Sequence, residues 1–273
     1  MSLEKCLENV RAAHPLIHCI TNYVTVNDVA NILLACGGSP IMADCPDEAE
    51  EITAVCGGLC VNIGTLNTAT IPSMLLAGKK AGALGHPSVL DPVGAGASRL
   101  RTDTAQNLLD QVRFTVVRGN MSEIKALERA GAARGVDADV ADRVTEENLP
   151  AAAEFVRSFA KKHGCVAAVT GAIDLVTDGG KLYAIRSGRP EMSNITGTGC
   201  QLSALTAAYV TANPGNALEA AAAAVCLMGL AGEIGYNAMR PGEGNSSYRN
   251  HIIDAVCNID GRTLKSEANC EII

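Results

Sequence analysis

Two glycines flank a threonine in Gly197-Thr198-Gly199, and Cys200 follows them directly. Residues 201–211 have the pattern of an amphipathic helix, which places the glycine turn at a predicted helix N-terminus. Backbone N–H groups and the helix dipole attract anions at such an end, and glycine lets the backbone approach a ligand closely. The turn therefore fits a cradle for a transferring phosphoryl group. The competing interpretation is an ordinary glycine-rich loop before a buried helix.

Cys200 would lie in the first turn of that helix, where the positive end of the dipole favours a thiolate. It is a candidate to accept a proton from a substrate hydroxyl, although cysteine is often simply buried. The chain has 11 cysteines without a C-x-x-C pair. Cys56 and Cys60 form the one close pair, and neither a histidine motif nor a second pair lies near them, which argues against zinc. We interpret the other ten cysteines as structural thiols of a reducing compartment.

Short apolar runs alternate with longer helical patterns along the chain, and this predicts an α/β fold with a mostly parallel central sheet and helices on both faces. The expected strands are residues 16–20, 40–43, 59–63, 88–90, 114–118, 166–170, 174–177 and 182–185. The expected helices are residues 26–35, 47–54, 67–81, 104–111, 122–129, 147–163, 201–211, 217–235 and 246–258. The last two strands, joined through Asp178-Gly179-Gly180, predict a hairpin at one edge of the sheet.

Ligands of such a sheet bind beyond the carboxyl ends of its parallel strands. Polar residues and glycines gather at these ends: Asn22, Met42, Gly64, Asp91, Arg118 to Glu123, and Thr170-Gly171. Several have ordinary alternatives, because Asp91 precedes a proline as turn residues do, Glu123 suits the first turn of a helix, and Thr-Gly is a common turn. We interpret His18 and His86 as structural.

The composition of the 273-residue chain allows one large core, with 48% hydrophobic residues. We expect a single domain over residues 1–273. A net charge of −7 without a basic cluster argues against a nucleic-acid surface. The charged start at residues 1–5 is unlike a signal sequence, and the apolar run 217–231 contains a glutamate and glycines, which favours a buried helix over a membrane span. We therefore expect a cytoplasmic protein without a membrane partner.

The Gly197–Cys200 turn resembles the anion-hole signature of the ribokinase-like superfamily, in which Asp is the usual last residue. Cysteine at that place is typical of hydroxyethylthiazole kinases and is also found in hydroxymethylpyrimidine kinases. Six further segments resemble hydroxyethylthiazole kinase alone and occur in the family's order, covering nearly the whole chain. They are CITNYVT at 19–25, NDVAN at 27–31, GGSPIMA at 37–43, NIGTL at 62–66, DPVGAG at 91–96 and RGNMSE at 118–123.

The resemblance implies an ATP-dependent kinase for the hydroxyl of 4-methyl-5-(2-hydroxyethyl)thiazole in thiamine salvage, assembled as a homotrimer with active sites at subunit interfaces. It implies these roles: Cys200 receives the substrate proton; Arg118, Thr170, Gly171 and Gly199 bind ATP; Met42 and Gly197 bind the thiazole, with Asn22 and Gly64 as further candidates; Asp91 and Glu123 hold Mg²⁺. Mg²⁺ commonly takes only one or two carboxylates beside phosphates and water, which suits this pair.

Three rival functions remain on the sequence alone. One is a kinase of the same superfamily for hydroxymethylpyrimidine or pyridoxal, against which segment 19–25 argues. Another is an ADP-dependent dehydratase for hydrated nicotinamide nucleotides, which would be expected to carry Asp in place of Cys200. The last is a nucleotide-binding sensor without catalysis, which would have no need to keep Asp91, Arg118, Glu123 and Cys200 together.

Overall fold

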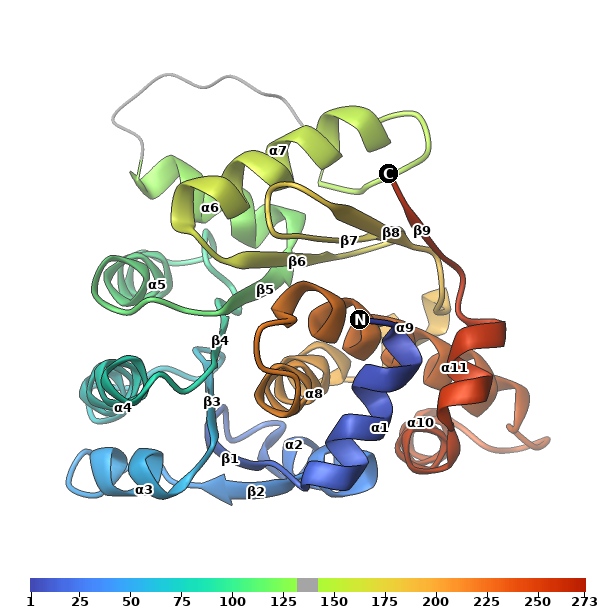
Figure 1. The fold of residues 1–273 in the computed structure, drawn as a ribbon, viewed down its shortest axis with the longest axis horizontal. Helices are drawn as coiled ribbons and strands as arrows, with labels where there is room; N and C mark the ends of the chain where they lie inside the picture. The colour runs from blue at the N-terminus through green and yellow to red at the C-terminus, as the bar shows by residue number, and fades with distance from the viewer. Residues whose placement is uncertain (132–141) are drawn as a thin grey trace.

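The computed structural model describes residues 1–131 and 142–273, and its nine strands form one sheet in the order β2-β1-β3-β4-β5-β6-β7-β8-β9 (Figure 1). The strands are β1 (Leu16–Ile20), β2 (Ser39–Met42), β3 (Gly58–Asn62), β4 (Ser88–Asp91), β5 (Val116–Asn120), β6 (Val166–Thr170), β7 (Asp174–Thr177), β8 (Leu182–Ile185) and β9 (Cys270–Ile272). Strands β1 to β6 are parallel, and β7 to β9 are antiparallel to their neighbours. The predicted fold class is therefore confirmed.

Helices cover both faces of this sheet, as Figure 1 shows for α3, α4 and α5 on one side and α8 on the other. The helices are α1 (Leu3–Ala13), α2 (Val26–Cys36), α3 (Ala49–Val55), α4 (Thr70–Leu84), α5 (Arg99–Gln111), α6 (Met121–Gly131), α7 (Leu149–His163), α8 (Thr198–Ala212), α9 (Ala217–Asn237), α10 (Asn245–Asn258) and α11 (Gly261–Glu267). Each face has its own hydrophobic core. Alternate strand residues point to opposite faces, so Cys19 belongs to one core and Ile20 to the other.

Helix α9 is the apolar run for which the sequence predicts a buried helix. It is long and apolar enough to cross a membrane, with a mean hydropathy of 1.6, yet 78% of the apolar stretch is buried inside the protein. Alanines 220–224 are all inaccessible to solvent. Helix α8 is buried in the same way from Gln201 to Val210, which fixes the glycine turn at its start against the sheet.

Several element boundaries differ from the prediction. The strand expected at 114–118 is β5, two residues later: Phe114 is a buried core residue before the strand, and Gly119 and Asn120 extend the ladder opposite Val169 and Thr170. Arg118 therefore does not end its strand. The helix expected at 104–111 begins at Arg99, because the Ser98 hydroxyl caps the N–H of Arg101.

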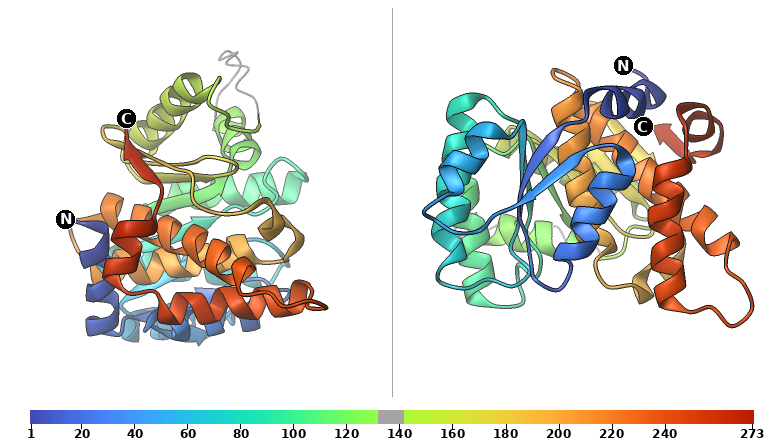
Figure 2. Two further views of the ribbon diagram at one scale, coloured as in Figure 1. Left: turned by 90° about the vertical axis from the view of Figure 1, so that its right-hand side faces the viewer. Right: turned by 90° about the horizontal axis from the view of Figure 1, so that it is seen from below.

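The predicted hairpin exists as β7 and β8, but it is not the edge of the sheet, because the short C-terminal strand β9 pairs with β8. Four elements are missing from the prediction: the 3₁₀ helix Pro190–Asn194, and α1, α11 and β9, which lie near the chain ends (Figure 2). Lys265 of α11 forms an ion pair with Glu4 of α1 at 3.0 Å.

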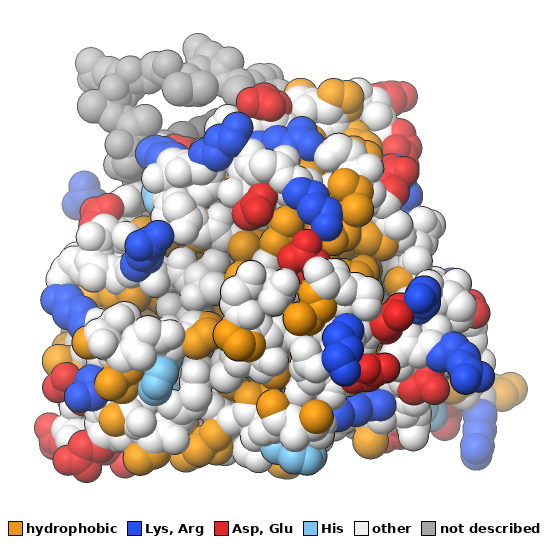
Figure 3. Space-filling view, in the orientation of Figure 1, with side chains coloured by type: hydrophobic (Ala, Val, Ile, Leu, Met, Phe, Trp, Pro, Cys, Tyr) orange, Lys and Arg blue, Asp and Glu red, His pale blue; other side chains and the backbone are white. Residues whose placement is uncertain are grey.

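Charged side chains of both signs are interspersed over the face seen in Figure 3. The expected single domain also includes residues 132–141, which lie outside the described residues.

Candidate active site

The glycine turn begins with Gly197, whose backbone takes a positive φ of 96° before helix α8. A Cβ at Gly197 would lie 2.6 Å from Cγ2 of Thr25, so both the backbone conformation and the space require glycine here. The carbonyl of Gly197 accepts the N–H of Gln201 at 2.9 Å. Helix α8 thus begins at Thr198, three residues before the predicted start at 201, and Cys200 lies in its first turn, as the sequence predicts.

Arg118 lies directly against that turn. A Cβ at Gly199 would be 2.6 Å from Nη1 of Arg118, so glycine here gives room to the guanidinium. Nη2 of Arg118 donates to Oγ1 of Thr170 at 2.6 Å, and Nη1 lies 3.6 Å from Oδ2 of Asp91. The side chain of Arg118 is only 12% exposed. A cation is therefore fixed beside the N-terminus of α8, where both attract a phosphate.

Asp91 ends β4 and is completely buried. Its Oδ2 accepts hydrogen bonds from Nδ2 of Asn62 and Oγ of Ser203, each at 2.8 Å, whereas its Oδ1 has no hydrogen-bond partner among the described residues. Burial raises the pKa of this carboxyl from 3.8 to about 6, against the opposing effect of Arg118. A buried carboxylate oxygen without a partner suits a cation ligand.

Glu123 holds two loops in place at the start of α6. Its Oε2 accepts the N–H of Asn120, and the Asn120 side chain in turn accepts the N–H of Glu123, which is a capping box. Its Oε1 accepts the N–H of Gly94 at 2.8 Å. Because both carboxylate oxygens already bind backbone N–H groups, Glu123 suits an indirect role toward a cation better than direct coordination. No group of three or more His, Cys, Asp or Glu side chains among residues 1–131 and 142–273 is arranged to hold a metal.

A cavity of about 730 Å³ opens beside Arg118 and the glycine turn. All four residues predicted to bind ATP line it: Arg118, Thr170, Gly171 and Gly199. Thr198 of the turn lines it as well, and Leu202, Val225 and Met228 give it an apolar wall. The size and the mixture of cationic and apolar lining suit a nucleotide.

Further charged groups line the same cavity. Arg186 is neutralised by Glu146 at 2.6 Å and Glu271 at 2.7 Å. Oδ1 of Asp174 accepts the N–H of Gly171 at 2.8 Å and so shapes the turn after β6. Burial raises the pKa of Asp174 to about 7, which the hydrogen bond from Gly171 opposes.

Cys200 lies on the other side of the turn, in a network of amides. Nδ2 of Asn22 donates to Sγ of Cys200 at 3.2 Å and to Oδ1 of Asn62 at 3.0 Å. Asn62 continues the network to Asp91. Asn62 and Asp91 stand in register at the ends of β3 and β4, so the sheet itself brings them together. A connected set of hydrogen bonds therefore runs from the thiol to the buried carboxylate.

The remaining predicted substrate residues lie around this network. A Cβ at Gly64 would be 2.9 Å from both Nδ2 of Asn22 and Oδ1 of Asn62, so glycine is needed for the two amides to meet. Met42 ends β2 opposite Cys19, and its half-buried side chain packs on the same core cluster as Cys200. No hydrogen bond links Met42 to the amide network among the described residues.

Two residues of the site were missed in the sequence: Asn62 and Ser203. Asn62 is a polar residue at the end of a wholly apolar buried strand, which is the signal that could have found it. Ser203 is fully buried one helical turn after Gly199, where its hydroxyl lies 3.3 Å from the Gly199 carbonyl and donates to Asp91 at 2.8 Å.

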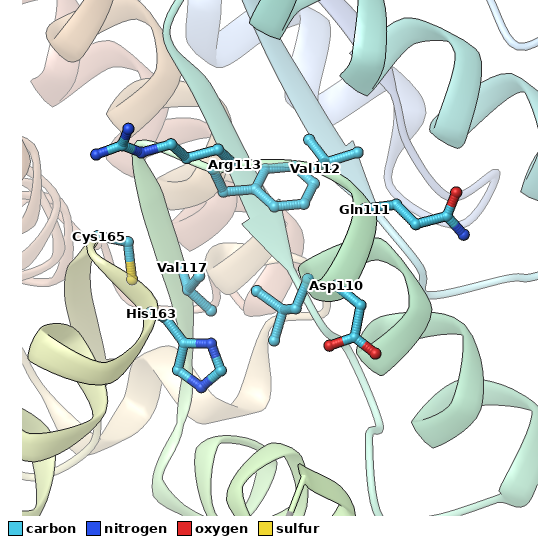
Figure 4. A pocket seen from close by; sticks show the side chains of 9 residues that line it. Asp110, Gln111, Val112, Arg113, Val117, His163 and Cys165 are labelled. Carbon is cyan, nitrogen blue, oxygen red and sulfur yellow. The ribbon is translucent and has the colours of Figure 1, made fainter.

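A second cavity, of about 260 Å³, lies at the opposite end of the sheet (Figure 4). Arg113 and Phe114 precede β5 there, and His163 and Cys165 precede β6. None of the predicted site residues lines it. It faces the amino ends of the strands, where parallel sheets do not place their ligands.

Comparison with known proteins agrees with this geometry. The model of the hydroxyethylthiazole kinase family matches residues 7–262. A hydroxyethylthiazole kinase of Clostridium acetobutylicum is 58% identical over 270 residues, which are 98% of this chain and 99% of the relative. The solved hydroxyethylthiazole kinase of Pyrococcus horikoshii OT3 superposes with a TM-score of 0.87 at 35% identity, covering 99% of this chain and 98% of that one. Pyridoxal kinase of Staphylococcus aureus with bound ADP, at 16% identity and a TM-score of 0.61 over 94% of this chain and 97% of that one, shares the fold.

Proposed function

The chain belongs to the hydroxyethylthiazole kinase family, and we propose that the site around helix α8 transfers the γ-phosphoryl group of ATP to the hydroxyl of hydroxyethylthiazole. The hydroxyl oxygen forms a bond to phosphorus, the bond from phosphorus to the β-phosphate oxygen breaks, and ADP leaves. The hydroxyl proton passes to a base. The two rival enzymes weighed from the sequence, a pyrimidine or pyridoxal kinase and a dehydratase, are not favoured by the family match.

A single observation carries the assignment of the site: one helical turn has a nucleotide-sized cavity on one side and a thiol on the other. Thr198 and Gly199 line the cavity, and the sulfur of the next residue, Cys200, accepts a hydrogen bond from the Asn22 amide. A phosphoryl group held at this N-terminus would lie between ATP and the acceptor alcohol. Backbone N–H groups of the turn and the guanidinium of Arg118 would stabilise its charge during transfer.

Mg²⁺ fits the acidic end of this site as part of the proposal. Asp91 offers a buried carboxylate oxygen without a partner, and Glu123 is close enough to raise the pKa of Asp91 further. With Asp91 as the direct ligand and Glu123 in an indirect role, the ion would complete its shell with phosphate oxygens and water, as Mg²⁺ commonly does. When bound, it would neutralise phosphate charge.

Cys200 is proposed as the acceptor of the hydroxyl proton. The N–H of Asn22 stabilises negative charge on its sulfur, and the dipole of α8 acts in the same direction. The thiazole would then bind on the Asn22 and Gly64 side of the turn, with Met42 and Gly197 as the further contacts of this proposal.

Assembly and compartment are also part of the proposal: a cytoplasmic homotrimer of single-domain subunits. Tyr23, Val24 and Leu34 support a partner subunit near the site, because they are 77%, 58% and 59% exposed beside or on α2. Light scattering of the purified protein tests this, and a monomer of unchanged turnover would contradict it.

The decisive test of the function is ATP consumption with Mg²⁺ against three alcohols: hydroxyethylthiazole, hydroxymethylpyrimidine and pyridoxal. We expect turnover with the thiazole, a phosphorylated product by mass, and its loss when a chelator removes the metal. Turnover with the pyrimidine or pyridoxal alone would overturn the substrate. Turnover that survives the chelator would overturn the role of Mg²⁺.

A further inference from the structure

Asn62 bridges the two halves of the site without touching either the thiol or the cavity. Its Nδ2 donates to Oδ2 of Asp91 at 2.8 Å. Its Oδ1 accepts the N–H of Gly64 at 2.9 Å and one N–H of the Asn22 amide at 3.0 Å. The side chain is buried, with 1% of its surface exposed, so water does not replace these partners.

Two of the partners fix which way the Asn62 amide points. A carboxylate only accepts hydrogen bonds when ionised, and a backbone N–H only donates. If the amide turned over, its oxygen would face the carboxylate of Asp91 and its NH₂ group would face the N–H of Gly64. Both contacts would then be repulsive, and the Asn62 amide and the N–H of Gly64 would lose these hydrogen bonds, while Oδ2 of Asp91 would keep only the one from Ser203.

The fixed oxygen of Asn62 in turn determines the orientation of Asn22. Because Oδ1 of Asn62 only accepts hydrogen bonds, the NH₂ group of Asn22 must face it. The backbone N–H of Thr25 donates to Oδ1 of Asn22 at 3.1 Å and holds the other end of the same amide. The second N–H of the same NH₂ group therefore points to Sγ of Cys200 at 3.2 Å. The sulfur faces a donor in every arrangement that satisfies the network.

We propose that Asn62 is a positioning residue for phosphoryl transfer, which acts through Asn22 to keep an N–H directed at the sulfur of Cys200. The inference rests on the proposed role of Cys200 as proton acceptor. The donor stabilises the thiolate before the substrate arrives, and the sulfur keeps its other lone pairs for the hydroxyl proton. The hydrogen bonds of Asn62 to Asp91 and to the N–H of Gly64 keep the Asn62 amide in the orientation that this role requires.

The ionisable groups around the first turn of α8 come from four neighbouring elements, and one of them is Asp91 of β4, which accepts the Ser203 hydroxyl of α8. Cys60 of β3 is another, and burial raises its pKa, with smaller effects of Asp91 and Cys200. Arg118 of β5 lies against Gly199, and Asp28 of α2 approaches Gly197. All of them stay in place when Asn62 is changed, so they act equally on the thiol in both proteins.

The experiment measures alkylation of Cys200 by iodoacetamide in the substrate-free enzyme, followed on its own peptide by mass spectrometry. We expect Asn62→Ala to slow alkylation about 10-fold near neutral pH, with a difference that narrows as the pH of the assay is raised. Turnover should fall about 10-fold while KM for ATP changes less than about twofold.

Ser203→Ala is the matched control, because it removes the other 2.8 Å hydrogen bond to Oδ2 of Asp91 and leaves the Asn22 amide untouched. Its alkylation profile should follow the wild-type profile. If it slows Cys200 as much as Asn62→Ala does, the effect comes from general damage around Asp91 and the proposal is wrong.

Asn22→Ala removes the donor itself and keeps the test valid if Asn62→Ala fails to fold. It should slow alkylation in the same pH-dependent way, and an unchanged profile would overturn the proposal. When both variants fold, the double variant should behave as Asn22→Ala alone, because Asn62 acts through Asn22. Additive effects would show that Asn62 acts by another route.

Failure of the proposed function gives a different pattern. If Cys200→Ala keeps wild-type turnover, Cys200 is not the proton acceptor and the positioning role has no reaction to serve. If turnover requires Cys200 and Asn62→Ala leaves both alkylation and turnover unchanged, the positioning role alone is wrong.

Discussion

At the scale of single residues, the first turn of α8 separates two tasks between neighbours. Gly199 has no side chain, and the guanidinium of Arg118 occupies the space beside it, on the side of the nucleotide cavity. Cys200 turns toward Asn22, on the side proposed for the alcohol. A change at either residue should therefore affect a different kinetic parameter.

Cys200→Ala should lower turnover by about 10²–10⁴-fold, because it removes the proton acceptor but leaves the phosphate contacts. Since phosphoryl transfer depends mainly on positioning, some activity should survive. Cys200→Asp should remain active, because a carboxylate at the same place can also accept the hydroxyl proton. Steady-state kinetics with hydroxyethylthiazole measures both variants. Full activity of the alanine variant, or a folded but inactive aspartate variant, would contradict the assignment.

Arg118→Lys should raise KM for ATP by about 10-fold or more, because an ammonium lacks the fork that reaches Thr170, Asp91 and a phosphate together. Arg186→Lys is the matched control. That arginine lines the same cavity but is already paired with Glu146 and Glu271. Its KM should change much less, and equal effects of the two substitutions would refute a specific phosphate contact of Arg118.

At the scale of elements, the packing of α8 on the sheet depends on a close approach at Gly58 of β3. A Cβ there would lie 2.1 Å from Oγ1 of Thr211 at the end of α8. Gly58→Ala should therefore destabilise the protein by about 1–3 kcal/mol, and Thr211→Ala in the same chain should restore most of the loss. Urea denaturation measures both.

Gly82→Ala is the control for that prediction, because a Cβ at Gly82 in α4 meets nothing within 4 Å. It should stabilise the protein by about 0.5–1 kcal/mol through its helix propensity. If both alanine variants lose stability alike, overpacking between β3 and α8 is not the cause.

The elements also show what the sequence could predict. Buried strands and their helices were found from apolar runs, and the strand ends pointed to Asp91, Arg118 and Thr170, because these polar residues interrupt apolar patterns. Asn62 was not predicted as a site residue, because its role depends on its position beside Asp91. The register of β3 and β4 sets that position, and register depends on tertiary structure. Helix α11 and strand β9 were missed for a related reason. They are short and depend on α1 and β8 for support rather than on a pattern of their own.

At the scale of the whole molecule, buried Asp91 links stability to pH. Its pKa is raised from 3.8 to about 6, so the native state holds a proton that the unfolded chain has released between these values. The free energy of unfolding therefore falls as pH rises through this window, by about 3 kcal/mol for this group.

Asp91→Asn lacks this titration, so the stability of the variant minus that of the wild type should rise by about 2–2.5 kcal/mol between pH 4 and pH 7. Urea denaturation in metal-free buffer measures the difference, and equal m-values at both pH values serve as the control for two-state behaviour. A difference that does not change with pH would show that Asp91 titrates as an ordinary carboxyl.

The meeting of the two chain ends has a consequence for biosynthesis. Helix α1 is synthesised before the residues that hold it in place: Nδ2 of Asn9 donates a hydrogen bond to Oδ1 of Asn213 at 2.8 Å, Nδ2 of Asn213 donates to the carbonyl of Cys6, and Glu4 forms an ion pair with Lys265. The apolar side of α1, with Cys6, Leu7 and Val10, packs in one core cluster with residues of α8 and α9. A ribosome-bound chain therefore exposes this side of α1 until α8 and α9 have emerged. Chaperones that shield nascent hydrophobic segments should engage α1 during that interval.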